Sequence, residues 1–331
     1  MTGPGVPAWS GPKSPRVEAA PRLPGQVRRT TSVDMEWPDG AEGALTLTGR
    51  GRDIVTLEDG AALVLATATL RVTATPDRVV WRVTSQPRAP GVADLVGLRL
   101  GPGFRAAASA ALGESLDGSL LALLVDDLPV TALISGFGLM RSQVLAGGLK
   151  RVASVRRIGT CTGWRDGGAA AVRAVAGEPA YHPDVVAAEP PEQGRDPDAW
   201  HAIPALPPQA MRRRRRLDVM PGADVAAVEA WFRDTVAEAD GSECALHEYT
   251  VRGEVAVGEG AVGWLESIPH VLPYVDCSGA APSSRLLDGT PLRELRAVVR
   301  ERLTGVVGCT HLNDALRSVA DVDHLLRLPV A

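Results

Sequence analysis

Four runs in the first third of the chain alternate apolar and polar residues, which predicts β-strands. Each run is bounded by Asp-Gly or Thr-Pro-Asp sequences that favour turns. In the third run, Leu70 and Val72 fall on one face and Arg71 falls on the other, as in a sheet covered on one side. The four runs span residues 28–37, 43–57, 62–74 and 78–87. Their order and short connections predict an antiparallel meander.

Helical spacing of apolar residues follows the predicted meander. One segment spans residues 104–112, directly after a Gly-Pro-Gly sequence. An apolar region over residues 120–140 comes next and is broken by Pro129. Asp126 and Asp127 lie in this region as paired carboxylates, but adjacent residues rarely point into one site. We therefore interpret the pair as the end of a helix.

Two more amphipathic segments close the chain. Residues 291–303 follow Thr290, a candidate helix cap, and stop before Gly305. A short Gly-Val-Val-Gly loop leads into the second segment, residues 309–326, whose apolar residues recur at intervals of three and four. The short loop predicts a helical hairpin with Cys309 at its joint.

The two halves of the chain share an order of features, which suggests an internal duplication. Each half has an arginine-rich strand start, then an Arg-Asp pair, then a tryptophan, and then apolar helical segments. These features fall at Arg28, Arg52-Asp53 and Trp81 in the first half and at Arg213, Arg233-Asp234 and Trp264 in the second. The pattern predicts an α+β fold of two related units, each an antiparallel sheet with packed helices. The alternative is chance recurrence in an arginine-rich α+β protein.

Composition shifts set the expected domain boundaries. The N-terminal stretch and the stretch before residue 210 are rich in proline and glycine, which is typical of tails and linkers. We expect a disordered tail (1–26), a first unit (27–165), a linker or surface excursion (166–209) and a second unit (210–331).

Charge and cysteine content narrow the class of protein. The formal net charge of −4 gives no general attraction to nucleic acid, and no run approaches the roughly 18 apolar residues of a membrane span. The N-terminus has no charged start followed by an apolar block, so it does not resemble a secretory signal. We expect a cytoplasmic protein with a small-molecule ligand and with neither nucleic acid nor membrane as partner. Its four cysteines are then free thiols, metal ligands or a nucleophile.

The strongest candidate for chemistry is a cysteine–histidine pair at the last helix. Thr310 is the expected N-cap, so Cys309 lies just before the first turn and His311 is the first helical residue. The free amides and the dipole of a helix N-terminus favour a thiolate at Cys309, and His311 would act as base, acid or metal ligand. Cys277 lies in a strand-like run and would join the two as a third catalytic residue or as a ligand of a zinc-type ion. The alternative is that buried cysteines only pack.

Several blocks resemble those of a known family. The sequences "LPYVDCSGAA", "GCTHLNDALRSVADV", "AWHAIP", "MRRRRRLDV", "FRDTV" and "HEYTV" resemble the longer actinobacterial-type members of domain-of-unknown-function family 2889 over nearly the whole chain after the tail. The resemblance brings no fold or activity with it. It marks Arg28, Arg29, Asp53, Cys277, Cys309 and His311. Relatives often carry Ser-His after Phe-Arg-Asp, whereas this chain has Thr235-Val236. Any role of the histidine in those relatives therefore cannot be assigned to this chain.

Arginines and two further histidines are secondary candidates. The 212–216 run would bind an anionic group through paired hydrogen bonds, but a solvated edge strand is the interpretation we favour. His201 and His247 would each serve as a fourth ligand or a base, although a packed histidine is the simpler interpretation of either one. The candidates for binding an anionic substrate are Arg28, Arg29, Asp53, His247, Arg213 and Arg215.

These features lead to one functional hypothesis and one rival. The hypothesis is a cytoplasmic small-molecule enzyme, of lyase or hydrolase type, using Cys277, Cys309 and His311 on an anionic metabolite. Thiolate–imidazole chemistry and a zinc-type ion both fit this site. The rival is a non-enzymatic binding or assembly module whose cysteines are structural.

Overall fold

Nine β-strands form one antiparallel sheet among the residues that the structure describes. The structure is a computed structural model and describes residues 10–16, 20–147, 155–178, 185–191 and 196–328. The strands are β1 (Val27–Glu36), β2 (Leu45–Thr56), β3 (Ala62–Ala74), β4 (Val80–Gln86), β5 (Val186–Ala187), β6 (Met211–Met220), β7 (Val225–Ala237), β8 (Glu243–Ala256) and β9 (Ala261–Val271). The four strands predicted in the first third of the chain are confirmed as β1 to β4.

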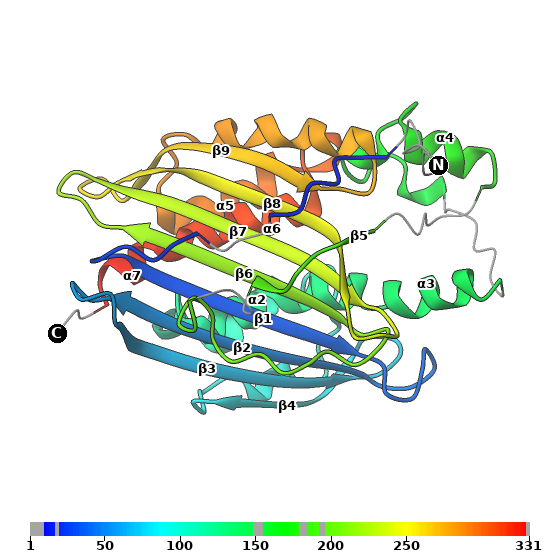
Figure 1. Cartoon of the computed structure of the whole chain (residues 1–331), viewed down its shortest axis with the longest axis horizontal. Helices are drawn as coiled ribbons and strands as arrows, with labels where there is room; N and C mark the ends of the chain where they lie inside the picture. Colours follow the sequence, from blue (N-terminus) through cyan, green and yellow to red (C-terminus); the bar gives the residue numbers. More distant parts are fainter. Residues whose placement is uncertain (1–9, 17–19, 148–154, 179–184, 192–195, 329–331) are drawn as a thin grey trace.

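The strand order is symmetric about the centre of the sheet. The order runs β4-β3-β2-β1-β6-β7-β8, with β9 and the short β5 both pairing with β8. Figure 1 shows β4 at one edge and β9 at the other. Two four-stranded meanders therefore meet where β1 pairs antiparallel with β6, so that Thr31 lies opposite Arg215. The α+β class is confirmed. The symmetric strand order is consistent with an internal duplication, which stays a prediction.

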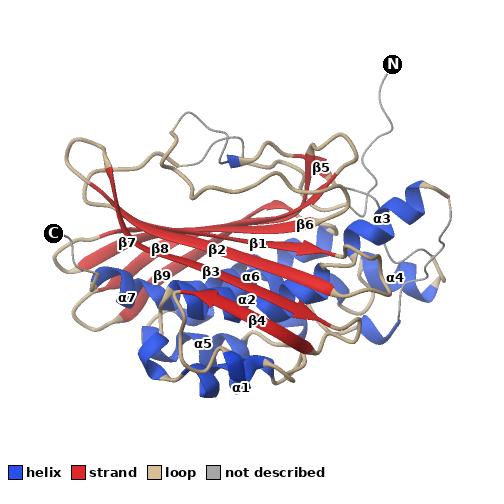
Figure 2. Cartoon of the chain, turned by 90° about the horizontal axis from the view of Figure 1, so that it is seen from below, coloured by secondary structure: helices blue, strands red, loops and turns tan. Residues whose placement is uncertain are grey.

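Helices cover one face of this sheet (Figure 2). The α-helices are α1 (Phe104–Leu112), α2 (Leu120–Ile134), α3 (Phe137–Leu145), α4 (Ala169–Val175), α5 (Leu292–Arg302), α6 (Thr310–Ser318) and α7 (Val322–Leu326). The 3-10 segments are η1 (Ala93–Leu95), η2 (Glu114–Leu116), η3 (Val155–Arg157), η4 (Thr162–Trp164), η6 (Val275–Leu287), η7 (Gly305–Val307) and η8 (Val319–Asp321). The helical hairpin is present, with α5 and α6 joined through η7.

Helix α2 is mostly apolar and packs against β1, β2 and β3 of the sheet, but it carries two aspartates. Asp126 and Asp127 lie in the middle of α2, so the helix-end interpretation is wrong. They point to different sides: Asp127 pairs with Arg215 of the sheet, whereas Asp126 pairs with Arg317 of α6. Pro129 lies within the helix without ending it. The arginine partners explain why the apolar helix tolerates both carboxylates.

By length and composition, the stretch Leu120–Leu145 is apolar enough to cross a membrane, since an 18-residue window within it has a mean hydropathy of 1.8. The sequence pattern did not predict this, because Asp126, Asp127 and Pro129 interrupt the run. In the structure, 78% of that window is buried inside the protein. Burial of this extent is typical of helices in a protein core.

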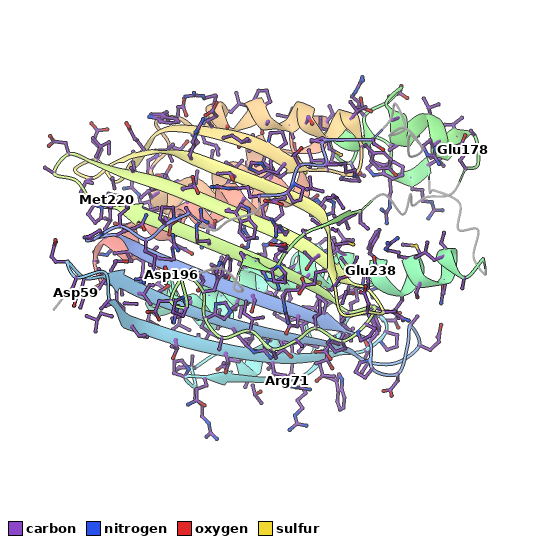
Figure 3. The ribbon with its side chains drawn as sticks, viewed as in Figure 1. Asp59, Arg71, Glu178, Asp196, Met220 and Glu238 are labelled. Carbon is purple, nitrogen blue, oxygen red and sulfur yellow. The ribbon has the colours of Figure 1, made fainter. Side chains whose placement is uncertain are left out.

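The opposite face of the sheet is covered by two segments that were expected to be a tail and a linker. Residues 10–16 and 20–26 lie on the sheet rather than free of it: Arg16 pairs with Glu229, and Arg22 with Asp196. The second segment, on both sides of β5, carries Asp196 across this face, where Figure 3 labels it. The rest of the predicted tail, residues 1–9 and 17–19, and residues 179–184 and 192–195 of the predicted linker lie outside the described residues.

The arginine run is the central strand β6, not a solvated edge. Its five arginines are each at most 4% exposed. Arg212, Arg214 and Arg216 face the covering segments and pair with Asp34, Glu243 and Asp218. Arg213 and Arg215 face the helices. The edge interpretation failed because each guanidinium has a carboxylate supplied by a neighbouring element, and paired charges can be buried.

Candidate functional site

A row of polar residues crosses the helix-covered face of the second meander. Arg213 of β6 lies opposite Asp234 of β7, and Asp234 lies opposite His247 of β8. Arg213 holds both carboxylate oxygens of Asp234, through Nε at 2.8 Å and Nη2 at 3.0 Å. His247 Nδ1 lies 3.3 Å from Asp234 Oδ2. The pairing of three adjacent strands therefore places a cation, an anion and an imidazole side by side.

Helix α6 lies across this row and contributes two residues one turn apart. The imidazole of His311 stacks on that of His247, with ring centroids 3.6 Å apart and planes 20° apart. Asp314, three residues later and on the same side of the helix, accepts from Arg213 Nη1 at 2.8 Å. Leu312, Ala315 and Leu316 bury the apolar side of α6 and fix this orientation. One helix turn therefore covers both ends of the polar row.

Asp234, His247 and His311 form a group of three metal-ligand types. One ligand atom from each lies within 4.8 Å of the other two. Asp234 and His247 are buried, and His311 is partly buried. His311 Nε2 is a buried nitrogen without a hydrogen-bond partner among the described residues, whereas the buried His247 Nδ1 has the 3.3 Å contact with Asp234 Oδ2. An unsatisfied buried nitrogen costs about 1–3 kcal/mol, so the ring of His311 lacks a partner that burial normally requires.

Burial and charge set the protonation of the three groups. Burial holds the pKa of His311 well below its ordinary value, and the neighbouring His247 lowers it further. Burial also lowers the pKa of His247, although Asp234 acts in the opposite direction. Burial alone would raise the pKa of Asp234, but Arg213 outweighs it and the pKa is lowered. At neutral pH the group therefore holds one carboxylate and two neutral imidazoles, the forms that bind metals.

Three of the four cysteines gather beside this group. Cys309 Sγ lies 3.9 Å from His311 Nδ1. Cys277 lies in η6 rather than at a strand end, and a Cβ built on Gly163 would meet its sulfur at 2.4 Å. Cys161 is close enough to raise the pKa values of Cys277 and Cys309. Among the described residues, the ligand group that converges within 4.8 Å contains no cysteine.

The expected activation of Cys309 by the helix N-terminus is outweighed by burial. Cys309 is itself the N-cap, and Thr310 is the first helical residue, so the predicted N-cap is one residue too late. Burial raises the pKa of Cys309 to about 11, although the amides of Leu312 and His311 act to lower it. Tyr249, whose hydroxyl donates to the Cys277 carbonyl oxygen at 3.2 Å, is fully buried in the same region. The thiol is therefore neutral at pH 7.

The remaining sequence candidates are held in ion pairs or hydrogen bonds. Arg28 pairs with Asp218, and Arg215 with Asp127. Arg29 pairs with both Asp53 and Asp321. His201 contacts Thr30 through Nδ1 and Ser32 through Nε2, both at 2.9 Å, on the opposite face of the sheet from α6. Each of these side chains is therefore held by at least one partner, although Arg28 Nη1 and Arg215 Nη1 are themselves buried nitrogens without a hydrogen-bond partner among the described residues.

Asp234 and Asp314 are the site residues that sequence reasoning missed. Asp234 stands in the "FRDTV" block, and its position as the counterpart of Asp53 was a usable signal. Asp314 lies three residues after His311, the spacing that places two side chains on one face of a helix. Neither position identifies a site residue until β7 is known to lie beneath α6.

Comparison with known proteins gives one match. Residues 211–324 match the model of the family described as protein of unknown function (DUF2889). No curated protein matches. No solved structure matches either. The matched range contains Arg213, Asp234, His247, Cys309 and His311, whereas the resemblance had been expected over nearly the whole chain. Residues 211–324, about a third of the chain, are therefore similar to the DUF2889 family of proteins of unknown function.

Proposed function

We propose that this chain is a cytoplasmic, metal-dependent enzyme for a small anionic molecule, with Asp234, His247 and His311 as the ligands of a zinc-type ion. The observation that carries the proposal is the buried Nε2 of His311, which has no hydrogen-bond partner among the described residues and lies beside His247 and the ionised carboxylate of Asp234. Two imidazoles and one carboxylate are a frequent catalytic donor set, since three protein ligands leave positions for water or substrate.

The three residues fit such an ion in charge and protonation. A metal takes up a lone pair from each ring, which satisfies both nitrogens at once. No proton must leave either imidazole, because burial already lowers both pKa values. Arg213 orients Asp234 through two hydrogen bonds, as residues behind metal ligands commonly do.

Binding would require the two rings to leave their stacked arrangement. Stacked rings keep their in-plane lone pairs in nearly parallel planes, whereas a shared ion needs lone pairs that converge at about 2.0–2.1 Å from each nitrogen. The stack contributes about 0.5–1.5 kcal/mol, and zinc binding in small protein sites contributes about 10–16 kcal/mol. Metal–nitrogen bonds would therefore outweigh the stacking, and we expect ring rotation on binding.

The ion would activate a bound water or polarise a carbonyl group. Around it, Arg213 holds Asp234 and also donates to Asp314, and the neutral thiol of Cys309 lies 3.9 Å from His311 Nδ1. The thiolate mechanism is less favourable, because burial raises the pKa of Cys309 to about 11.

Metal content of the purified protein tests the proposal. We expect about one equivalent of a divalent transition metal, and loss of most of it in His247→Gln and in His311→Gln. His270→Gln is the matched control, because His270 on β9 already contacts Thr250 and lies outside the ligand group. The protein should then hydrolyse p-nitrophenyl acetate only when loaded with metal.

Two results would reject the proposal. One is metal-free protein that gains no equivalent of zinc, iron, manganese or cobalt on titration. The other is metal content that is equal in all three variants. Substitution with cobalt also defines the donor set, because a sulfur-to-cobalt charge-transfer band would add Cys309 as a ligand. Either rejecting result would return the non-enzymatic module as the better hypothesis.

A further inference from the structure

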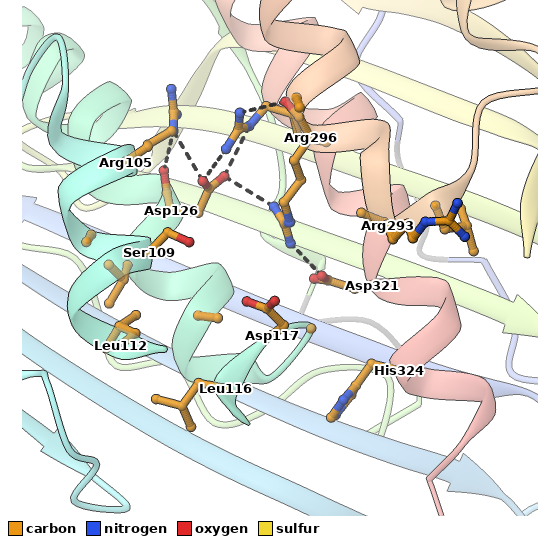
Figure 4. Close-up of a pocket in the computed structure, with 18 of the residues that line it drawn as sticks. Arg105, Ser109, Leu112, Leu116, Asp117, Asp126, Arg293, Arg296, Asp321 and His324 are labelled. Carbon is orange, nitrogen blue, oxygen red and sulfur yellow. Dashed lines mark hydrogen bonds and ion pairs between the residues drawn. The ribbon is translucent and has the colours of Figure 1, made fainter. Parts of the chain in front are cut away.

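A groove of about 540 Å³ opens on the helical face, between α1 and α2 on one side and α5, α6, η8 and α7 on the other. Figure 4 shows Arg105 and Asp126 across the groove from Arg296. The volume lies within the usual range for small-molecule sites, about 300–1,000 Å³. The groove is lined by residues other than Asp234, His247 and His311.

Arginines outnumber aspartates in the lining of the groove. Three guanidiniums, those of Arg105, Arg296 and Arg317, converge on the carboxylate of Asp126. Arg105 pairs in addition with Asp314, and Arg296 with Asp321. The pull of the three guanidiniums lowers the pKa of Asp126 even though burial acts to raise it. Over the whole lining, six arginines face four aspartates, in a chain whose formal net charge is −4. The groove therefore concentrates positive charge on a protein that is negative overall.

Donors in the groove are available to a ligand. Arg105 uses Nε for the Asp126 carbonyl oxygen and Nη2 for Asp314, and Nη1 has no partner among the described residues. At the rim, Arg293 and Arg300 are 79% and 60% exposed and pair only with neighbouring glutamates of α5. Exposed pairs of this kind are weak, about 0–1 kcal/mol, so an entering anion can compete for these arginines.

Most of the remaining lining is apolar, with Ser109 and His324 as polar exceptions. Leu112 and Leu116 lie on one side, and Leu292, Ala297 and Ala320 on the other. A site with charged donors at one place and aliphatic walls elsewhere suits a molecule with an anionic head and an apolar body.

We propose that this groove binds a small organic anion, a carboxylate or a phosphate ester, with its charged group between Arg105, Arg296 and the rim arginines of α5. The site is separate from the histidine group but connected to it by alternating charges. Arg105 donates to Asp314, Asp314 accepts from Arg213, and Arg213 holds Asp234. The binding itself requires neither a metal nor turnover, so its test is independent of the proposed enzyme.

Calorimetric titration of the purified full chain with three matched probes tests the proposal. Hexanoate and hexyl phosphate carry the two anionic groups on one apolar body, and hexylammonium carries the opposite charge. We expect one site for at least one of the anions, and no binding of hexylammonium. Binding of hexanoate alone identifies a carboxylate site, and binding of hexyl phosphate alone identifies a phosphate site.

Variants then locate the site. The double variant Arg293→Gln/Arg300→Gln should weaken anion binding about five-fold, the effect of two exposed charges. Arg82→Gln/Arg252→Gln removes the same charge from exposed strand positions and should leave the affinity unchanged. Asp126→Asn should strengthen anion binding several-fold, because it removes the carboxylate that now competes for three arginines. A loss of folding cannot produce that gain.

The proposal is overturned by any of three results: no anion binds, hexylammonium binds as well as the anions, or both double variants weaken binding equally.

Discussion

The imidazole rings of His247 and His311 lie face to face with their centroids 3.6 Å apart, although they come from a strand and a helix more than sixty residues apart in the chain. His247 Nδ1 contacts Asp234, whereas the buried Nε2 of His311 has no hydrogen-bond partner among the described residues. Packing alone does not account for an unsatisfied nitrogen at this contact, because an apolar ring would avoid that cost. A ligand shared with His247 and Asp234 accounts for it.

Arg213→Gln should destabilise the protein by about 3–5 kcal/mol, because it leaves the buried carboxylate of Asp234 without its arginine and takes one of its arginine partners from Asp314. Urea unfolding measures the change in the free energy of unfolding. Arg252→Gln is the control, since Arg252 forms an exposed pair with Glu266, and its cost should stay below about 1 kcal/mol. Equal costs for the two variants would contradict the buried ion network.

The elements of the fold were predictable because strand and helix patterns are local. The four strands of the first meander and the segment at residues 104–112 agree with the structure within a few residues. The pairing of β1 with β6 was not predictable, since it joins residues far apart in the chain. That pairing placed the arginine run at the centre of the sheet, where composition alone predicts a solvated edge.

The candidate site was predictable only in part, for the same reason. His311 and His247 were both identified, but their contact depends on how α6 crosses β7 and β8. A thiolate at Cys309 was predicted from the helix N-terminus alone, but burial has the larger effect on the pKa of this thiol. A competition between two effects on one pKa cannot be decided before the packing is known.

Cys309 should react slowly with iodoacetamide at pH 7, since burial raises its pKa to about 11 and the thiolate is the reactive form. Mass spectrometry of the folded protein measures the rate at each cysteine. We expect Cys309 to be slower than a thiol in the same protein unfolded in urea by at least about 100-fold, from burial and protonation together. Rapid labelling of Cys309 in the folded protein would return the thiolate mechanism to first place.

Gly163→Ala should cost about 1–3 kcal/mol, because a Cβ there would lie 2.4 Å from the sulfur of Cys277. Adding Cys277→Ala removes that sulfur, and the next atom, the Cβ of residue 277, is at an ordinary 3.7 Å. The double variant should therefore be less destabilised than the sum of the two single variants. Additive losses by thermal unfolding would show that the two residues do not touch.

His201 should make the protein sensitive to acid. Burial, together with Arg52 and Arg50, lowers the pKa of His201 to about 3 from 6.5. Below pH 6.5 the unfolded chain binds a proton at this residue and the folded chain does not, so stability falls as the pH drops from 6.5 towards 3. The loss amounts to about 1.4 kcal/mol per pH unit for one histidine.

His201→Gln should remove that slope while keeping a side chain that can bond to Thr30 and Ser32. Urea unfolding at several pH values between 4 and about 7 measures the difference from the parent protein. His324→Gln, at a half-buried histidine, should change the slope less. Parallel stability curves for the parent and His201→Gln would show that His201 titrates normally.

The most direct test of the metal proposal is anomalous X-ray scattering from crystals grown with zinc. The account predicts one anomalous peak bounded by Asp234, His247 and His311, about 2.0–2.2 Å from one ligand atom of each, with the two imidazoles turned out of their stack. Crystals that bind zinc elsewhere and keep the two rings stacked, with no peak between these three side chains, would contradict it.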